Sequence, residues 1–136
     1  MLVLDTDIMV DVLRGYQPAL EWLASLDDAP VLPGFVVMEL MGGCRNRREM
    51  DLVSKLCTPF RIFWPTAYDC NRAVEDFRTS HLSHNLGILD AVIAEMVVGL
   101  GATLFTFNLK HFRSVDRLTT VAPYEKSRPY DSDRVI

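Results

Sequence analysis

Met1-Leu2-Val3-Leu4-Asp5-Thr6-Asp7 is the stretch on which the fold prediction depends. Its apolar run has no polar alternation, which is typical of a strand buried on both faces inside a parallel sheet. Asp5 then lies at the carboxyl end of an inner strand, where open α/β sheets bind ligands. The alternative is that Asp5 or Thr6 only caps the following helix, since both side chains accept hydrogen bonds from a first turn. Other acids converging on the same place would decide between the two.

The remaining chain alternates between short apolar runs and amphipathic segments. The sequence predicts further strands at 31–33, 59–65, 102–107 and 118–122, with Pro33 limiting the pairing of the first. It predicts helices at 7–13, 19–26, 35–43, 46–56, 67–82 and 88–100, and a loop at 108–112. This alternation favours an α/β fold of three layers, a central parallel sheet of four to five strands with helices on both faces.

Two helices carry more specific expectations. The inner stripe of the helix over 67–82 is predicted to include Ala73, Val74 and Phe77. In the helix over 88–100, helical spacing places Asp90 on the same face as Ala94. Residues 1–124 are expected to form one domain, followed by a polar tail over 125–136.

Composition limits the class of protein. A chain of 136 residues with 49% apolar content can bury its own core without metals or disulfides. The three cysteines, Cys44, Cys57 and Cys70, are an odd number without C-x-x-C spacing, which indicates reduced thiols in a cytoplasmic protein. No window approaches the roughly 18 apolar residues of a membrane span, and no basic region precedes the first apolar run. The sequence therefore predicts a soluble protein that is not exported.

The net charge of −4 argues against a protein that coats nucleic acid broadly, because such a protein shows a basic surface. Basic residues do gather locally, at 45–48 and at 110–113, and these groups lie in predicted loops or on exposed helix surface. They indicate either local contacts with phosphates or an ordinary solvated surface.

Asp5, Glu39 and Asp90 each fall where the apolar pattern predicts burial or a strand end. Taking one ionised carboxylate out of water costs on the order of several kcal/mol. Three clustered carboxylates would consume the roughly 5–15 kcal/mol that stabilises a whole domain. A divalent cation offsets this cost, because Mg²⁺ and Mn²⁺ prefer hard oxygen ligands, and it also supplies the chemistry of phosphodiester hydrolysis.

Each acid has a simpler alternative. Asp90 could lie at the helix N-terminus simply because its negative charge interacts favourably with the helix dipole. Asp7 could be an ordinary acid in the first turn of its helix. Glu39 could face solvent. Their combination is harder to explain in this way than any single member.

The chain resembles the PIN-domain ribonucleases, and among them the VapC-type toxins of toxin–antitoxin pairs. The resemblance runs from Met1 to about Ala122 and is carried by the order and spacing of several segments. These are Leu4-Asp5-Thr6-Asp7-Ile8, Asp11-Val12-Leu13-Arg14-Gly15, Val37-Met38-Glu39-Leu40 with Gly42-Gly43, Leu89-Asp90-Ala91-Val92-Ile93-Ala94, Gly101-Ala102-Thr103-Leu104, Thr106-Phe107-Asn108 and His111-Phe112.

The resemblance implies a Mg²⁺- or Mn²⁺-dependent endoribonuclease. Asp5 and Asp90 would be the principal metal ligands, and Glu39 a further ligand or the group that polarises the attacking water. Thr6 and Asp7 match positions that hold metal-bound water or substrate. Phosphate contacts would come from Arg14 or from the cluster Arg45, Arg47 and Arg48, and His111 is a further candidate for contact with the substrate.

The chain departs from the family in its last loop, where a fourth acid is common. Asn108 and His111 occupy the corresponding positions, with Asp116 further along. Asn108 could still hold a catalytic water through its carbonyl. We therefore expect one firmly held ion and a second that arrives only with substrate.

The resemblance also implies partners. Such toxins cut structured cellular RNA, often tRNA, and so stop translation. They usually form homodimers and are inhibited by an antitoxin whose C-terminal segment blocks the acidic pocket. Promoter DNA is bound through the antitoxin, and no membrane is involved.

Two other functions were weighed. Asp5-x-Asp7 after an apolar strand also resembles phosphatases of the haloacid-dehalogenase type, but that motif has Thr or Val where Met9 stands, and the chain is short for the family's cap. The second alternative, which Asn108 leaves open, is a PIN-like module that binds RNA or a partner without cutting. His81 and His84 have helical spacing but no third ligand nearby, which indicates surface histidines.

Overall fold

The computed structural model of the chain describes residues 1–126 and shows a five-stranded parallel sheet with the order β3-β2-β1-β4-β5. The strands are β1 (Leu2–Leu4), β2 (Val31–Pro33), β3 (Arg61–Phe63), β4 (Thr103–Phe105) and β5 (Thr120–Val121). The first strand lies at the centre, where Val3 pairs with Val31 on one side and with Leu104 on the other. The predicted parallel sheet is confirmed. Because β1 is the central strand, its carboxyl end lies midway along the edge formed by the carboxyl ends of the strands.

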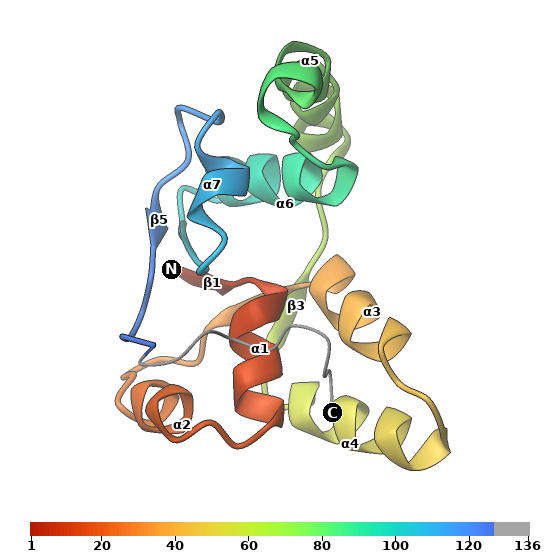
Figure 1. Cartoon of the computed structure of the whole chain (residues 1–136), viewed down its shortest axis with the longest axis vertical. Coiled ribbons are helices and arrows are strands. Elements are labelled where there is room, and N and C mark those ends of the chain that lie inside the picture. Colours follow the sequence, from red (N-terminus) through yellow and green to blue (C-terminus); the bar gives the residue numbers. More distant parts are fainter. Residues whose placement is uncertain (127–136) are drawn as a thin grey trace.

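Helices cover both faces of the sheet. They are α1 (Thr6–Leu13), α2 (Gln17–Ala24), α3 (Gly34–Gly42), α4 (Arg47–Cys57), α5 (Ala67–His84), α6 (Ile88–Gly99) and α7 (Leu109–Phe112). Figure 1 shows α1 to α4 on one side of the sheet and α5, α6 and α7 on the other. The three-layer prediction is therefore confirmed.

Local capping explains where several helices begin. Asp5 caps α1, Asn46 caps α4 by accepting the Glu49 N–H at 2.9 Å, and Thr66 forms a reciprocal capping box with Asp69 at the start of α5. At the other end of α5, Asn85 takes a left-handed conformation with φ 54°, within the break expected between the two long helices.

The expectation of a loop at 108–112 is wrong. The segment forms the single helical turn α7, and Phe112 anchors it in the core with 2% of its surface exposed. The burial of one aromatic side chain and the hydrogen bond from the His111 N–H to the Asn108 carbonyl oxygen are local features that the hydropathy pattern of so short a segment does not reveal.

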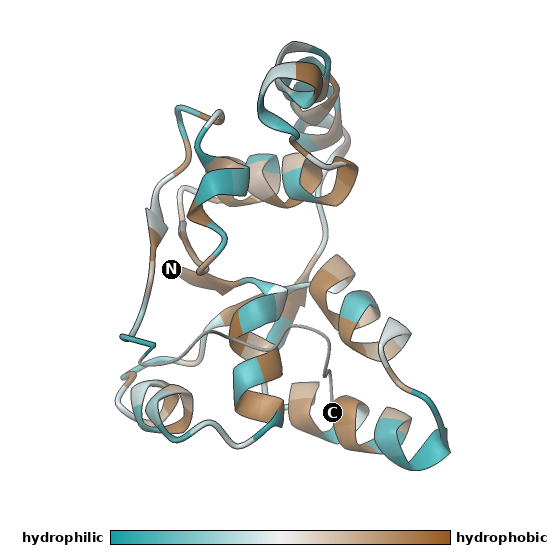
Figure 2. Cartoon of the chain, in the orientation of Figure 1, coloured by the Kyte–Doolittle hydropathy of each residue, from teal (hydrophilic) through white to brown (hydrophobic). Residues whose placement is uncertain are grey.

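The inner stripe of α5 also differs from its prediction. Ala73 is buried and Phe77 is half-buried, but Val74 is 63% exposed. The face of α5 that packs on α6 carries charges instead, because Arg72 bonds to the fully buried Glu95 of α6 at 2.8 Å. Figure 2 shows the contrast between a largely hydrophobic α6 and a largely polar α5.

The core lies on both faces of the central strands and is fully buried at Leu4, Ile8, Leu32, Leu40, Ile93 and Leu104. Within residues 1–126, no helix combines the length and the apolar character needed to cross a lipid bilayer. Of the expected tail, residues 127–136 lie outside the described residues. Lys126 is described, and its ammonium lies 3.0 Å from Asp11 in α1.

Candidate active site

Asp5 lies at the carboxyl end of β1 and is 6% exposed. Its Oδ1 accepts the Thr6 N–H at 2.8 Å, and its Oδ2 accepts the hydroxyl of Thr106 at 2.8 Å. Asp5 therefore caps α1, which is the simpler of the two functions expected for it. It also contacts Thr106 at the end of β4. Each carboxylate oxygen retains a lone pair beyond these two hydrogen bonds.

The pKa of Asp5 is raised to about 7, chiefly by burial and also by the charges of Asp7 and Asp90, while the hydrogen bonds from Thr106 and Thr6 act in the opposite direction. Burial likewise raises the pKa of Glu39, with contributions from Asp5 and Asp90. The three acids thus act on one another electrostatically, although they come from three different elements. This is the arrangement that makes an added cation favourable.

Glu39 lies on α3 and points toward the start of α1, where the Thr6 hydroxyl donates to its Oε2 at 3.2 Å. Glu39 is exposed, in keeping with the expectation of a solvent-facing helix residue, yet its carboxylate is on the Asp5 side of α3. Thr6 therefore links two of the acids, one through its N–H and one through its hydroxyl.

Asp90 lies in the first turn of α6, and its Oδ2 is 3.5 Å from Nδ1 of His111 in α7. A Cβ at the preceding Gly87 would lie 3.0 Å from the same oxygen, so the glycine leaves this carboxylate room. Within residues 1–126, no lysine or arginine forms an ion pair with any of the three acids. In the described part of the chain, their charges are therefore not balanced by a lysine or arginine.

Thr106 is a site residue that the sequence reasoning did not select. It is fully buried at the end of β4, and its Oγ1 also accepts the N–H of Asn108 at 3.0 Å. The apolar run at 102–107 contains two polar residues, Thr103 and Thr106, and the position of Thr106 near its carboxyl end was the available signal. Through Thr106, the loop that carries Asn108 is joined directly to Asp5.

Asp7 is placed differently from the expectation that it holds substrate or metal-bound water. Its Oδ1 accepts the Ile8 N–H at 2.9 Å, and its Oδ2 accepts the Phe107 N–H at 2.8 Å. Burial raises its pKa, while the hydrogen bond from Phe107 and the charge of Lys126 lower it. Asp7 therefore ties the first turn of α1 to the segment after β4.

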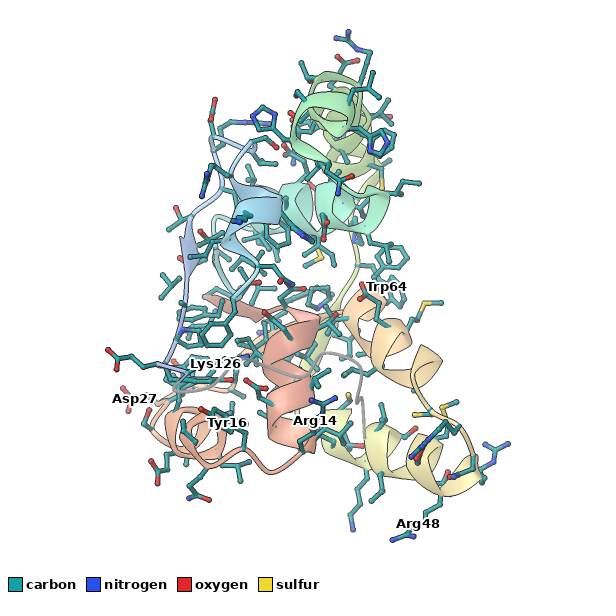
Figure 3. All side chains as sticks on the ribbon, viewed as in Figure 1. Arg14, Tyr16, Asp27, Arg48, Trp64 and Lys126 are labelled. Carbon is teal, nitrogen blue, oxygen red and sulfur yellow. The ribbon has the colours of Figure 1, made fainter. Side chains whose placement is uncertain are left out.

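The predicted phosphate contacts do not gather at the acids. Arg14 follows the last residue of α1, about 13 Å along the helix axis from Asp5. Arg45 is bound to Glu49, with its Nη2 3.0 Å from Oε2. Figure 3 shows Arg48 at the edge of the molecule farthest from α5. Of these predicted phosphate contacts, His111 lies at the acidic site, beside Asp90.

The predicted surface histidines do not form a metal site either. Nδ1 of His81 lies 2.8 Å from the carbonyl oxygen of Leu86, and its ring stacks on Phe77 at 4.4 Å between centroids. His84 instead contacts the hydroxyl of Ser83 at 2.7 Å.

The acidic donor set fits a hard divalent cation, because carboxylate oxygens are the ligands that Mg²⁺ and Mn²⁺ prefer. Within residues 1–126, no three His, Cys, Asp or Glu side chains are arranged as a ready coordination group. Glu39 contacts Thr6 and Asp90 contacts His111. The residue types fit a hard divalent cation, with Asp5, Asp90 and Glu39 as the side chains that would hold it.

Residues 2–118 match the sequence profile of the family described as PIN domain. The chain belongs to the PIN-domain family. One relative of this PIN domain is ribonuclease VapC10 of Mycobacterium tuberculosis, which is 32% identical over 121 residues, covering 87% of this chain and 90% of the relative. The chain is thus a PIN domain of the VapC ribonuclease type, and the phosphatase alternative is set aside.

Solved structures show the same fold. A toxin–antitoxin complex from Klebsiella pneumoniae contains a chain that aligns with this PIN domain at a TM-score of 0.75 and 23% identity, covering 93% of this chain and 100% of that one. The VapBC2 structure from Rickettsia felis, bound to a DNA fragment from its promoter, aligns at a TM-score of 0.72 and 22% identity, covering 88% and 96%.

Proposed function

We propose that this protein is the toxin of a toxin–antitoxin pair and acts in the cytoplasm as a Mg²⁺- or Mn²⁺-dependent endoribonuclease on structured RNA, with tRNA as the favoured substrate. The observation that carries the proposal is the convergence of Asp5, Glu39 and Asp90 without a lysine or arginine partner in the described part of the chain. Such a cluster is costly for the apoprotein and is stabilised by a divalent cation.

Asp5 and Asp90 are the proposed metal ligands, with Glu39 as a third ligand or as the base that receives a proton from the attacking water. The raised pKa of Glu39 suits the second role, because a base works best when its pKa is nearer the working pH. A bound cation would lower the pKa of its water and neutralise charge on the scissile phosphate. Thr6 orients Glu39, and Thr106 orients Asp5.

The last loop supports a single protein-held cation. Asn108 offers an amide where a fourth carboxylate would give a second ion a charged ligand, so a second ion would depend on substrate phosphate. We propose that the Asn108 carbonyl positions a water and that the His111 side chain contacts a phosphate next to the cut. Asp7 supports this segment through the hydrogen bond from the Phe107 N–H.

Phosphates farther from the cut are assigned to the basic residues of the other helical layer. Arg47, Arg48 and Lys55 border an open surface depression on α4, and Arg45 lies just before it. Arg14 belongs to the same side of the sheet. Glu39 lies on α3, the helix that directly precedes α4 in the chain.

Partners follow from the acidic site and from one apolar surface. A basic side chain of an antitoxin segment would pair with the uncompensated carboxylates and block them. Support comes from solved complexes in which chains of this fold are found with antitoxins. Promoter DNA is then bound through the antitoxin.

A homodimer is proposed through the surface that α5 and α6 leave uncovered. Val74 is 63% exposed and Ile88 is 68% exposed, beside a groove of about 300 Å³. The groove is lined by Cys70, Ala73, Val74, Phe77, Ile88, Ala91 and Val92. Apolar exposure of this kind is typical of a surface that a partner covers.

The test is RNA cleavage by purified protein with Mn²⁺, using total tRNA and matched variants. Asp5→Asn and Asp90→Asn should each lose at least about 100-fold in rate, because either change removes a metal ligand. Asp27→Asn is the control, since Asp27 is an exposed turn residue remote from the site (Figure 3). Cleavage that persists in both acid variants would exclude the proposed site, and tRNA binding without cleavage by the wild type would favour the non-catalytic module.

A further inference from the structure

The segment that follows β5 is fastened to α1 by a buried acid. We call residues 123–126 the C-terminal strap. Two of its side chains meet at Asp11, which is 1% exposed: the Tyr124 hydroxyl donates to Asp11 Oδ2 at 2.6 Å, and the Lys126 ammonium lies 3.0 Å from the same oxygen. Lys126 is itself mostly buried, with 15% of its side chain exposed. Figure 3 shows Lys126 on the α2 side of α1.

The same two side chains enclose Phe107. The Lys126 ammonium lies 4.1 Å from the centroid of the Phe107 ring, a cation–π distance, and the Tyr124 ring meets it edge-on at 4.9 Å. Tyr124 also lies near Tyr16 and Trp22, at 6.0 and 6.2 Å between centroids. The ring of Phe107 is therefore held by the strap, not by the body of the sheet alone.

Phe107 is the middle residue of the segment that shapes the acidic site. Its N–H donates to Asp7, the preceding Thr106 donates to Asp5, and the following Asn108 donates back to Thr106. A shift of the Phe107 ring would therefore disturb all three hydrogen bonds. Two of them are accepted by acids, Asp7 in the first turn of α1 and Asp5 at the end of β1.

We propose that Lys126 and Tyr124 are positioning residues of the acidic site: by clamping Phe107 they hold Thr106 and Asn108 in register with Asp5. This inference rests on the proposed metal-dependent function. A buried ion pair such as Lys126–Asp11 costs desolvation and contributes little net stability, so its main effect is to select one arrangement of the strap. Removing Lys126 alone would leave the Asp11 carboxylate buried without its cation and lower the stability, so metal binding is compared under conditions where the variant is folded.

The test compares Lys126→Met, which keeps an unbranched apolar stem, with Lys126→Arg, which keeps the charge. Arg78→Met is the control, because Arg78 forms an exposed pair with Glu75 on α5. Isothermal titration with Mn²⁺ should show an affinity about tenfold weaker than the wild type in Lys126→Met. The affinity should stay near the wild-type value in Lys126→Arg and in Arg78→Met. Amide hydrogen exchange should rise over 105–111 in Lys126→Met and remain unchanged in α5.

Unchanged Mn²⁺ affinity and unchanged exchange over 105–111 in a folded Lys126→Met would overturn the inference. If that variant does not fold, Tyr124→Phe, which lacks only the hydroxyl bound to Asp11, must show the same two changes to a smaller degree. Failure of the proposed function looks different, because the wild type itself would then bind no Mn²⁺, while the exchange experiment would still report whether the strap holds the segment.

Discussion

The hydroxyl of Thr106 donates a 2.8 Å hydrogen bond to Oδ2 of Asp5, joining two residues that are 101 positions apart in the sequence. Both groups are buried, so neither can exchange this partner for bulk water. The bond joins the ends of two neighbouring strands and fixes the orientation of the acid at the centre of the sheet.

Thr106→Val should show how much this hydrogen bond contributes to the stability of the fold and to the pKa of Asp5. The change keeps the side-chain shape but leaves Oδ2 of Asp5 without its donor, so the pKa of Asp5 should rise further and the free energy of unfolding should fall by about 1–3 kcal/mol. Urea unfolding and RNA cleavage with Mn²⁺ would measure the two effects. Thr106→Ser retains the hydroxyl and should stay close to the wild type, and a Val variant as active and as stable as the Ser variant would contradict the assignment.

The raised pKa of Asp5 predicts a pH-dependent stability in the absence of metal. In the folded protein the carboxyl keeps its proton up to about pH 7, whereas in the unfolded chain it loses the proton near pH 4. The folded state therefore binds more protons between these values, and its stability should fall as the pH rises from about 4 to about 7. The loss should amount to about 2–4 kcal/mol.

Urea titrations in EDTA at pH 5 and pH 8 would measure this loss. Asp76 must be considered with Asp5, because burial and a hydrogen bond with Glu95 raise its pKa to about 7 as well. Asp5→Asn and Asp76→Asn should each reduce the difference in unfolding free energy between pH 5 and pH 8. Adding Mn²⁺ at pH 8 should restore stability in the wild type but not in Asp5→Asn, and a restoration of equal size in both would place the cation elsewhere.

Glu95 provides a separate prediction about the layer formed by α5, α6 and the segment after α7. It is fully buried and accepts from Arg72 at 2.8 Å and from Arg117 at 2.7 Å. Glu95→Gln removes the charge that both guanidinium groups face, and we expect a loss of about 2 kcal/mol, moderated because both arginines are partly exposed. Thermal unfolding would measure this loss.

Glu75→Gln is the matched control for Glu95→Gln, since the Glu75–Arg78 pair lies on the outer surface of α5. It should leave the unfolding temperature unchanged. Equal effects of the two changes would show that burial does not strengthen the Glu95 network. At a temperature where it is folded, the Glu95 variant should retain Mn²⁺-dependent cleavage, because the network lies apart from the acids that face Asp5.

The sequence was sufficient for the order and type of the long elements because their signal is local. The run before Asp5 is apolar at every position, and this alone indicates a central strand. Asp5, Glu39 and Asp90 could be selected because acids in apolar surroundings are unusual. That they act on one another electrostatically required the fold, since three separate elements carry them.

Other features depend on partners that lie far away in the chain. Glu95 was as anomalous in its apolar helix as Asp90, yet its arginines are 23 and 22 positions away, so the pairing became visible only in the fold. Lys126 was assigned to a tail because its own neighbours are polar. Its contacts with Asp11 and Phe107 exist only once β5 has joined the sheet.

The apolar groove between α5 and α6 predicts self-association that one charge should abolish. Val74 lines the groove and is 63% exposed, so Val74→Glu places a carboxylate where a second copy would bury the surface. Light scattering during size exclusion should show a dimer for the wild type and a monomer for the variant. Leu82→Glu is the control, because Leu82 is 95% exposed on the same helix and does not line the groove. A dimer that survives Val74→Glu, or one that is lost equally in Leu82→Glu, would show that the copies meet through another surface.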